Sequence, residues 1–130
     1  MDQIDKDKIK ESVQRVLSPD LLKPYWRKQQ EKTGNKFTGH CYAATEACFH
    51  LLGGYNGKFK SYILTHKSFP EELKEGETHW FLKSDDGELV DPTEKQFNHT
   101  IPYEKGRRQA FLTKMPSKRA KTIIERIQIG

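Results

Sequence analysis

Three side chains of this sequence are of the types that can act together as a nucleophile, a base and an orienting group: Cys41, His79 and Asp91. Cys41 stands at the start of a predicted helix, where unpaired N–H groups and the positive end of the helix dipole favour a thiolate. A neighbouring imidazole would help by taking the thiol proton. Gly39, just before, leaves room for a substrate backbone, and the Cys41 amide could point at a developing oxyanion. The spacing therefore indicates an activated thiol at Cys41.

A predicted hairpin brings the histidine and the aspartate together. Residues 78–84 and 88–91 have the pattern of two strands, and Asp85-Asp86-Gly87 has the composition of a three-residue turn. This turn pairs Ser84 with Glu88. Because side chains alternate across a strand, His79 and Asp91 then fall on one face as diagonal neighbours, roughly 7 Å apart. An imidazole–carboxylate hydrogen bond is expected there.

The second cysteine is expected to be inert. Cys48 lies seven residues after Cys41, two turns into the same helix, between Ala47 and Phe49. A helix separates the two backbones by about 10 Å, which forbids a mutual disulfide and leaves two free thiols. Together with His40 and His50 the cysteines form a group of metal-capable residues, but a helix does not make their side chains converge and no C-x-x-C pair is present. We expect no metal site.

Helices and strands that position these residues follow from periodicity. Apolar residues at helical spacing predict a helix over 5–17, and Ser18-Pro19 predicts the capped start of a second, short helix that Pro24 interrupts. A surface loop is expected over 29–38, the central helix over 41–52, a strand over 58–66 and a polar loop over 67–77. The chain is expected to be irregular from Pro92 to Gly106. Ser117 is expected to cap a last helix, whose apolar stripe is Ala120, Ile123, Ile124 and Ile127.

Together these elements predict an α+β fold, in which the helix that begins at Cys41 packs on a small antiparallel sheet. With 130 residues and 15.2 kDa, a single domain over 1–130 is expected. It divides into a helical part (1–38), a core with the candidate site (39–97) and a basic extension with a helix (98–130). The sequence has neither an apolar run of membrane-spanning length nor the apolar stretch of a signal peptide, so an intracellular, cytoplasmic protein is expected.

Charge is concentrated near the C-terminus. The net charge is +5, and the segment 105–126 is rich in lysine and arginine, with Glu125 the one acidic residue in it. Such a segment is expected to form either a solvated face or a surface that binds an anionic partner. Arg107, Arg108, Lys118 and Arg119 are the candidates for holding an anion, the last two because they follow Ser117 at a helix start. Trp26 and Trp80 are expected in the core, and Trp80 is also a substrate-binding candidate.

Four short motifs resemble a known group of enzymes. Gly39-His40-Cys41, the helix stop Gly53-Gly54, Thr78-His79-Trp80, and Asp91-Pro92-Thr93 followed by Gln96-Phe97 resemble the Cys, His, Asp order of the papain-like and transglutaminase-like cysteine enzymes. Among them, the small YunG-like bacterial and phage proteins are the most similar, with a G-x-C helix, a Gly-Gly stop, an H-[WY] strand and a D-x-T-x-x-Q-F segment. The resemblance covers residues 39–97.

This resemblance implies a papain/transglutaminase-like core and a hydrolase or acyltransferase with a catalytic triad. Cys41 would be the nucleophile, His79 the base and Asp91 the residue that orients the imidazole. The substrate would be a small amide or peptide, the acceptor water or an amine, and no cofactor is expected. A protein of a phage would act in the cytoplasm of its host. The position six residues before the nucleophile, a glutamine in papain-like enzymes, is Asn35 here, so Asn35, His40 and Gln30 are candidates for the second oxyanion donor.

The alternative is a binding module without catalysis. In this hypothesis the basic segment 105–126, with Tyr103 and Phe111 among its charges, would hold a nucleic acid or another polyanion, or an acidic protein. No recognised nucleic-acid-binding motif is present. An activated Cys41 would favour the enzyme, and polyanion binding that weakens steeply with salt would favour the binding module.

Overall fold

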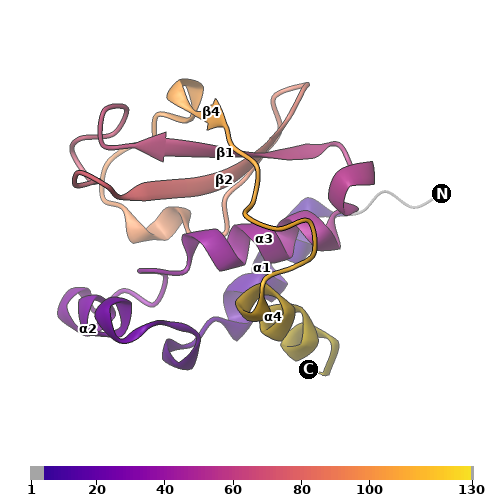
Figure 1. The fold of residues 1–130 in the computed structure, drawn as a ribbon, viewed down its shortest axis with the longest axis horizontal. Coiled ribbons are helices and arrows are strands. Elements are labelled where there is room, and N and C mark those ends of the chain that lie inside the picture. The colour runs from indigo at the N-terminus through magenta and orange to yellow at the C-terminus, as the bar shows by residue number, and fades with distance from the viewer. Residues whose placement is uncertain (1–4, 130) are drawn as a thin grey trace.

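The computed structural model describes residues 5–129 (Figure 1). Within these residues the chain forms four α-helices and a four-stranded antiparallel sheet, which confirms the predicted α+β class. The helices are α1 (Lys6–Val16), α2 (Pro24–Thr33), α3 (Cys41–Leu51) and α4 (Lys118–Ile129). The strands are β1 (Phe59–Thr65), β2 (Thr78–Ser84), β3 (Leu89–Val90) and β4 (Arg107–Arg108), in the order β3-β2-β1-β4. Short 3₁₀ helices cover Pro19–Leu21, Gly54–Asn56, Glu94–Gln96 and Tyr103–Lys105.

The central helix α3 lies between the sheet and the pair α1 and α4 (Figure 1). Its alanines Ala43, Ala44 and Ala47 are buried, and their small side chains let neighbouring elements approach closely. The core on this side of the sheet also takes Leu82 and Val90 from the hairpin. None of the helices within residues 5–129 has the length and apolar character that a bilayer crossing requires.

The other face of the sheet is covered by irregular chain. A second apolar cluster contains Leu64 and Phe81 from β1 and β2, and Phe69 and Leu73 from the loop between these strands. Phe97 and Tyr103, from the segment after β3, pack against the same cluster. Two loops therefore bury a sheet face that would otherwise be open to solvent.

The register of the predicted hairpin is confirmed. Leu82 pairs with Val90 and Lys83 with Leu89, and the Ser84 amide donates to the Glu88 carbonyl oxygen at 2.9 Å. Gly87 has φ of +90°, the left-handed conformation expected of the glycine in this turn. Asp91 follows directly after β3, on the face that carries His79.

The structure corrects the prediction for residues 18–38. Ser18 makes no capping hydrogen bond, because its hydroxyl instead contacts Asp20 and accepts from Arg126. Pro24 begins α2 rather than breaking it, as a first helical position requires no N–H donor. Residues 29–33 of the expected loop are therefore helical, and the buried Gln30 side chain donates to the Lys36 carbonyl oxygen at 2.8 Å.

At the C-terminal end the last helix is confirmed, whereas β4 was not predicted. The Ser117 hydroxyl accepts from the Ala120 amide at 3.3 Å, and Ala120 and Ile123 are fully buried. The buried Glu46 carboxylate of α3 accepts from the Ser117 amide and hydroxyl, and so joins α3 to the start of α4. β4 is only two residues long and depends on the edge of β1, so no periodicity marks it.

Candidate active site

Cys41 is the first residue of α3 and is half-buried. Its thiol faces the first residue of β2, with the sulfur 3.6 Å from the Thr78 carbonyl oxygen. Gly39 sets the entry of the chain, because its φ is +84° and an added Cβ would lie 2.9 Å from the Cβ of Trp26. A glycine is therefore required two residues before the thiol.

His79 lies on β2 and is fully buried. Its Nε2 atom is 2.6 Å from Oδ2 of Asp91, so the diagonal contact predicted from the hairpin register is present. The Phe97 ring packs edge-on against the imidazole at 4.8 Å between centroids, and Phe81 lies parallel to it at 6.5 Å. Packing on both sides fixes the plane of the imidazole ring.

The Asp91 carboxylate is buried and is held by two further donors. Its Oδ1 accepts from the Thr93 amide at 3.2 Å, and its Oδ2 accepts from the Tyr103 hydroxyl at 2.8 Å. Burial and the neighbouring carboxylate raise the pKa of Tyr103, which keeps the hydroxyl protonated as a donor. These donors satisfy the buried carboxylate and fix its position beside the imidazole.

The electrostatic environment favours the charged form of the imidazole. Burial by itself lowers the pKa of His79, but the Asp91 carboxylate and the Cys41 thiol together outweigh burial, so that the pKa is raised to about 9. Asp91 and the Cys41 thiol thus both favour the protonated ring. Because Nε2 faces Asp91, Nδ1 is the nitrogen left for exchanging a proton with Cys41.

Gln96 is part of this site, although sequence reasoning gave it no role. Its Nε2 atom lies 3.2 Å from Nδ1 of His79 and 3.1 Å from Oγ1 of Thr93. The side chain is half-buried and lines the same cleft as Cys41. Tyr103 was likewise noted only as an aromatic residue beside basic charges. For Gln96, the place of the residue in the D-x-T-x-x-Q-F segment is the one feature of the sequence that points to the site. No feature of the sequence points to Tyr103.

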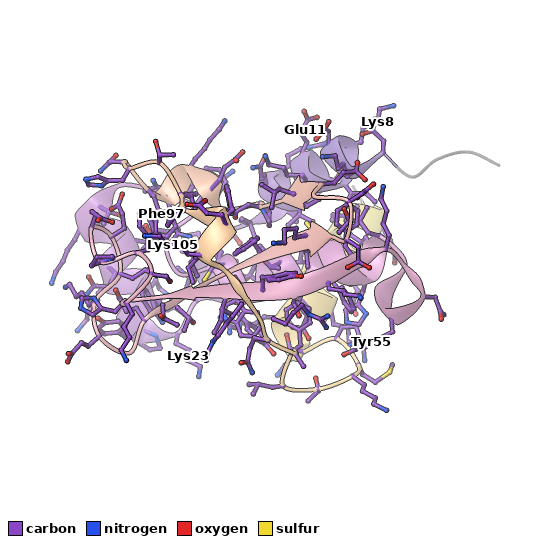
Figure 2. All side chains as sticks on the ribbon, turned by 90° about the horizontal axis from the view of Figure 1, so that it is seen from above. Lys8, Glu11, Lys23, Tyr55, Phe97 and Lys105 are labelled. Carbon is purple, nitrogen blue, oxygen red and sulfur yellow. The ribbon has the colours of Figure 1, made fainter. Side chains whose placement is uncertain are left out.

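Cys41 opens into a cleft with a volume of about 460 Å³. One part of its wall comes from α2 and the residues before α3, a second part from the loop between β1 and β2, and a third from Gln96 and Phe97. Lys23 and Phe97, two of the lining residues, lie toward the same end of the molecule, and Tyr55 lies toward the other (Figure 2). The end that carries Lys23 and Phe97 is also the end at which α3 begins (Figure 1).

The backbone at the start of α3 could supply oxyanion donors. Among residues 5–129, the amides of Cys41, Tyr42 and Ala43 have no hydrogen-bond acceptor. Such free N–H groups at a helix start stabilise negative charge on a nearby oxygen.

None of the predicted side-chain candidates for an oxyanion donor lines the cleft. Asn35 donates to the Lys95 carbonyl oxygen at 2.9 Å, and Gln30 is committed to Lys36. His40 is buried, with its Nε2 atom unpartnered. Burial, together with the nearby Arg119 and Lys36, lowers the pKa of His40 to about 4.

The candidates for binding substrate or anions are divided between different surfaces. Trp80 and Arg119 line the cleft. Trp80 is half-buried and packs on Tyr42 and Phe111 at the edge of the core, whereas Trp26, also expected in the core, is half-buried at the cleft and belongs to neither apolar cluster. Arg107 and Arg108 are exposed on β4, on the opposite side of α3 from α4, which carries the exposed Lys118 (Figure 1). The basic segment therefore does not form one continuous face.

Cys48 is fully buried among apolar side chains, and burial raises the pKa of its thiol strongly. A protonated thiol of this kind is a poor nucleophile, in agreement with the inert role expected of it. In the part of the chain that the structure describes, no group of three or more His, Cys, Asp or Glu side chains is arranged to hold a metal ion.

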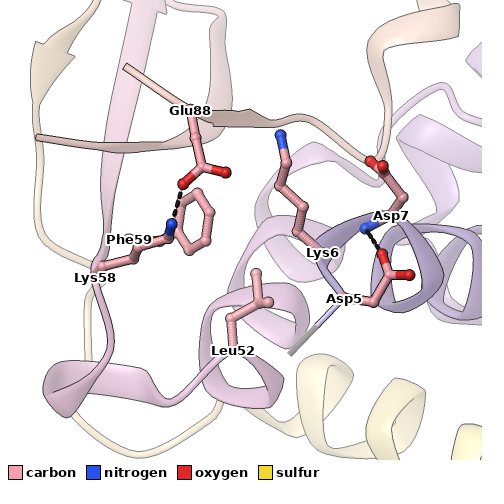
Figure 3. Close-up of a pocket in the computed structure, with 7 residues that line it drawn as sticks. All are labelled: Asp5, Lys6, Asp7, Leu52, Lys58, Phe59 and Glu88. Carbon is pink, nitrogen blue, oxygen red and sulfur yellow. Dashed lines mark hydrogen bonds and ion pairs between the residues drawn. The ribbon is translucent and has the colours of Figure 1, made fainter. Parts of the chain in front are cut away.

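A second pocket of about 500 Å³ lies at the other end of the molecule, between the start of α1 and the hairpin (Figure 3). Lys58 pairs with Glu88 on one side of it, and Asp5 caps α1 on the other. The Lys6 side chain extends between these two sides (Figure 3). The pocket is lined by no thiol and no imidazole, so its greater size does not make it a candidate for nucleophilic chemistry.

Comparisons of the chain with family models, with curated proteins and with solved structures found no match.

Proposed function

We propose that this protein is a thiol-dependent acyl-transfer enzyme, a hydrolase or acyltransferase that uses Cys41, His79 and Asp91, with a core of the papain-like and transglutaminase-like kind. The observation that carries the proposal is the buried pair of His79 and Asp91 on the hairpin, next to the strand start that the Cys41 thiol contacts from the first residue of α3. The likeness of residues 39–97 to the YunG-like proteins supports the same proposal. An intracellular, cytoplasmic site of action would keep the thiol reduced.

In the first half of the proposed reaction, the Cys41 sulfur attacks the carbonyl carbon of an amide or ester. His79 has taken the thiol proton on Nδ1, and the carbonyl oxygen becomes an oxyanion that the free amides of α3 stabilise. The bond to the leaving amine or alcohol then breaks as His79 returns the proton to it. Asp91 holds the ring and stabilises its positive charge throughout, and a thioester on Cys41 remains.

In the second half, water or an amine attacks the thioester carbon. Neutral His79 removes a proton from the attacking group, and the carbon–sulfur bond breaks to release an acid or a new amide. The imidazolium and the thiolate are then restored. Water and amine acceptors use the same residues, so the acceptor decides between hydrolysis and transfer.

Trapping the acyl-enzyme tests the proposal. We expect p-nitrophenyl acetate to give a burst of nitrophenol and an acetyl group on Cys41, located by peptide mass mapping. Cys41→Ser removes both, whereas Cys48→Ser, the matched thiol control, leaves both unchanged. His79→Gln slows the burst by roughly 10²–10⁴-fold. A primary amine added to the reaction distinguishes hydrolysis from transfer, because an enzyme that transfers the acetyl group would form the acetylated amine. Acetylation that is equal at Cys41 and Cys48, or that survives Cys41→Ser as a burst, would refute the proposal.

A further inference from the structure

The charged residues of the Cys41 cleft come from two parts of the structure, the loop between β1 and β2 and the helical side. The loop between β1 and β2 contributes Glu72, Lys74 and Glu77. The helical side contributes two cations and no acid: Lys23, which precedes α2, and Arg119, in the first turn of α4. An approaching substrate therefore meets positive charge on the helical side of the cleft.

The two acidic residues are engaged within the protein. The Glu72 carboxylate accepts from the amides of Asn98 and His99 and from the His99 ring. The Glu77 carboxylate accepts from the Lys74 amide at 2.8 Å. These contacts hold the irregular chain around the cleft, so neither carboxylate serves as a partner for Lys23 or Arg119.

The two cations of the helical side have no ion-pair partner within residues 5–129. This contrasts with Arg126, on the same helix as Arg119, which pairs with Asp20. Arg119 is half-buried, and a guanidinium that is partly removed from water gains most from a planar oxyanion such as a carboxylate.

Arg119 also lies close to the candidate nucleophile. Its positive charge acts on the two residues that flank Cys41: after burial, it is the largest cause that lowers the pKa of His40, and it opposes the burial that raises the pKa of Tyr42. Arg119 and Cys41, the first residue of α3, line the same cleft. An anion bound by Arg119 would lie near the carbonyl that the sulfur attacks.

The aromatic residues of the cleft complete the binding surface. Trp26 packs against Gly39, and Trp80 packs beside Tyr42. Their rings offer an apolar surface for the carbon part of a substrate next to the cationic side. A molecule that satisfied both would carry an anionic group beside an apolar or peptide-like body.

We propose that the acyl donor is an acidic molecule, whose carboxylate is held by Arg119 and Lys23 while Cys41 attacks the neighbouring carbonyl. This inference rests on the proposed function and names the substrate class for the same site.

Alkylation with two reagents that differ in charge tests it. Iodoacetate carries a carboxylate and iodoacetamide is its neutral counterpart; with both, the sulfur attacks the methylene carbon, a carbon–sulfur bond forms and iodide leaves with the electron pair. We would measure the ratio of the two rates at Cys41 in a Cys48→Ser background at low salt. The same ratio for mercaptoethanol gives the reference. A ratio for Cys41 about fivefold above the reference is expected from one nearby cation.

Variants assign this ratio to the cleft. Arg119→Gln should remove most of this fivefold preference, and adding Lys23→Gln should bring the ratio to the mercaptoethanol value. Arg119→Lys, which keeps the charge, should retain most of it. Lys28→Gln is the matched control, because Lys28 is an exposed cation of α2 that does not line the cleft, and it should leave the ratio unchanged.

Two results overturn the inference: a wild-type ratio equal to the reference, or an equal loss in Arg119→Gln and Lys28→Gln. Failure of the proposed function has a different signature. If iodoacetamide reacts with Cys41 no faster in the wild type than in His79→Gln, the thiol is not activated and both proposals fall. If only the charge preference is missing, the acyl-transfer proposal stands and its substrate is not anionic.

Discussion

The buried imidazole of His79 is charged because the Asp91 carboxylate lies against it. Burial alone favours the neutral ring, so the direction of the pKa shift depends on Asp91. Tyr103 and the Thr93 amide hold that carboxylate in place. At the scale of single residues, the site is a buried pair of His79 and Asp91, and the second ring nitrogen, Nδ1, lies 3.2 Å from the amide nitrogen of Gln96, which lines the cleft.

Asp91→Asn should lower the pKa of His79 well below about 9, because only the Cys41 thiol then opposes the effect of burial. The measurement is an NMR titration of the imidazole carbon-bound protons between pH 5 and pH 10. Tyr103→Phe serves as comparison, since it removes a donor to Asp91 but leaves the carboxylate next to the ring. A titration of His79 that is the same in Asp91→Asn and wild type would contradict this electrostatic account.

Site residues that lie on regular strands or at helix starts could be predicted from the sequence. Those that lie in irregular segments of the chain could not. Alternation along two hairpin strands suffices to place His79 beside Asp91. Gln96 and Tyr103 reach the same imidazole and carboxylate from 3₁₀ turns. Such turns have no periodicity that would show which way their side chains point.

At the scale of elements, the position of the thiol depends on how the chain enters α3. The left-handed Gly39 packs against Trp26 of α2, and two residues later the helix begins at Cys41. The extent of α3 could be predicted because its helix formers end at Gly53-Gly54. The extent of α2 could not, since the contact that the Gln30 side chain makes with the Lys36 backbone is tertiary information.

Gly39→Ala should destabilise the fold and displace the start of α3. A left-handed conformation strains any residue with a Cβ by roughly 1–2 kcal/mol, and the contact with Trp26 adds to this cost. Gly76→Ala is the matched control, because Gly76 has the same φ of +84° with nothing within 4 Å of an added Cβ.

Urea unfolding of both variants gives the measurement, with the alkylation rate of Cys41 as the readout of position. The loss of stability should be greater for Gly39→Ala, and only this variant should alter the reactivity of Cys41. An equal loss in the two glycine variants would mean that the Trp26 contact has no role.

At the scale of the whole molecule, two buried histidines give the free energy of unfolding opposite slopes against pH. The pKa of His79 is raised, so its contribution is full below pH 6.5 and is lost as the pH rises toward 9. The pKa of His40 is lowered, so the unfolded chain binds the additional proton and stability is lost as the pH falls from 6.5 toward 4. Stability should therefore be greatest near pH 6.5.

Urea midpoints measured at pH 5, 6.5, 8 and 9 check this expectation. The fall from pH 6.5 to 9 should amount to at most about 3 kcal/mol, from the size of the His79 shift. Asp91→Asn should remove the alkaline decline, and His40→Gln should reduce the acid decline. A wild-type stability that rises steadily from pH 6.5 to 9 would show that the folded protein does not hold the His79 proton.

The central claim is that Cys41 reacts as a thiolate paired with the His79 imidazolium, and its most direct test is the rate of iodoacetamide labelling of Cys41 against pH. We would compare the wild type with His79→Gln, both with Cys48→Ser, and verify by circular dichroism that the two are folded.

A simple thiol with the ordinary pKa of about 8.5 gains roughly two-hundredfold in rate between pH 6 and 9. We expect the wild type to react fast already at pH 6, and its labelling rate to rise less than about tenfold between pH 6 and pH 9. His79→Gln should show the profile of a simple thiol. Identical profiles in the two proteins would contradict the account.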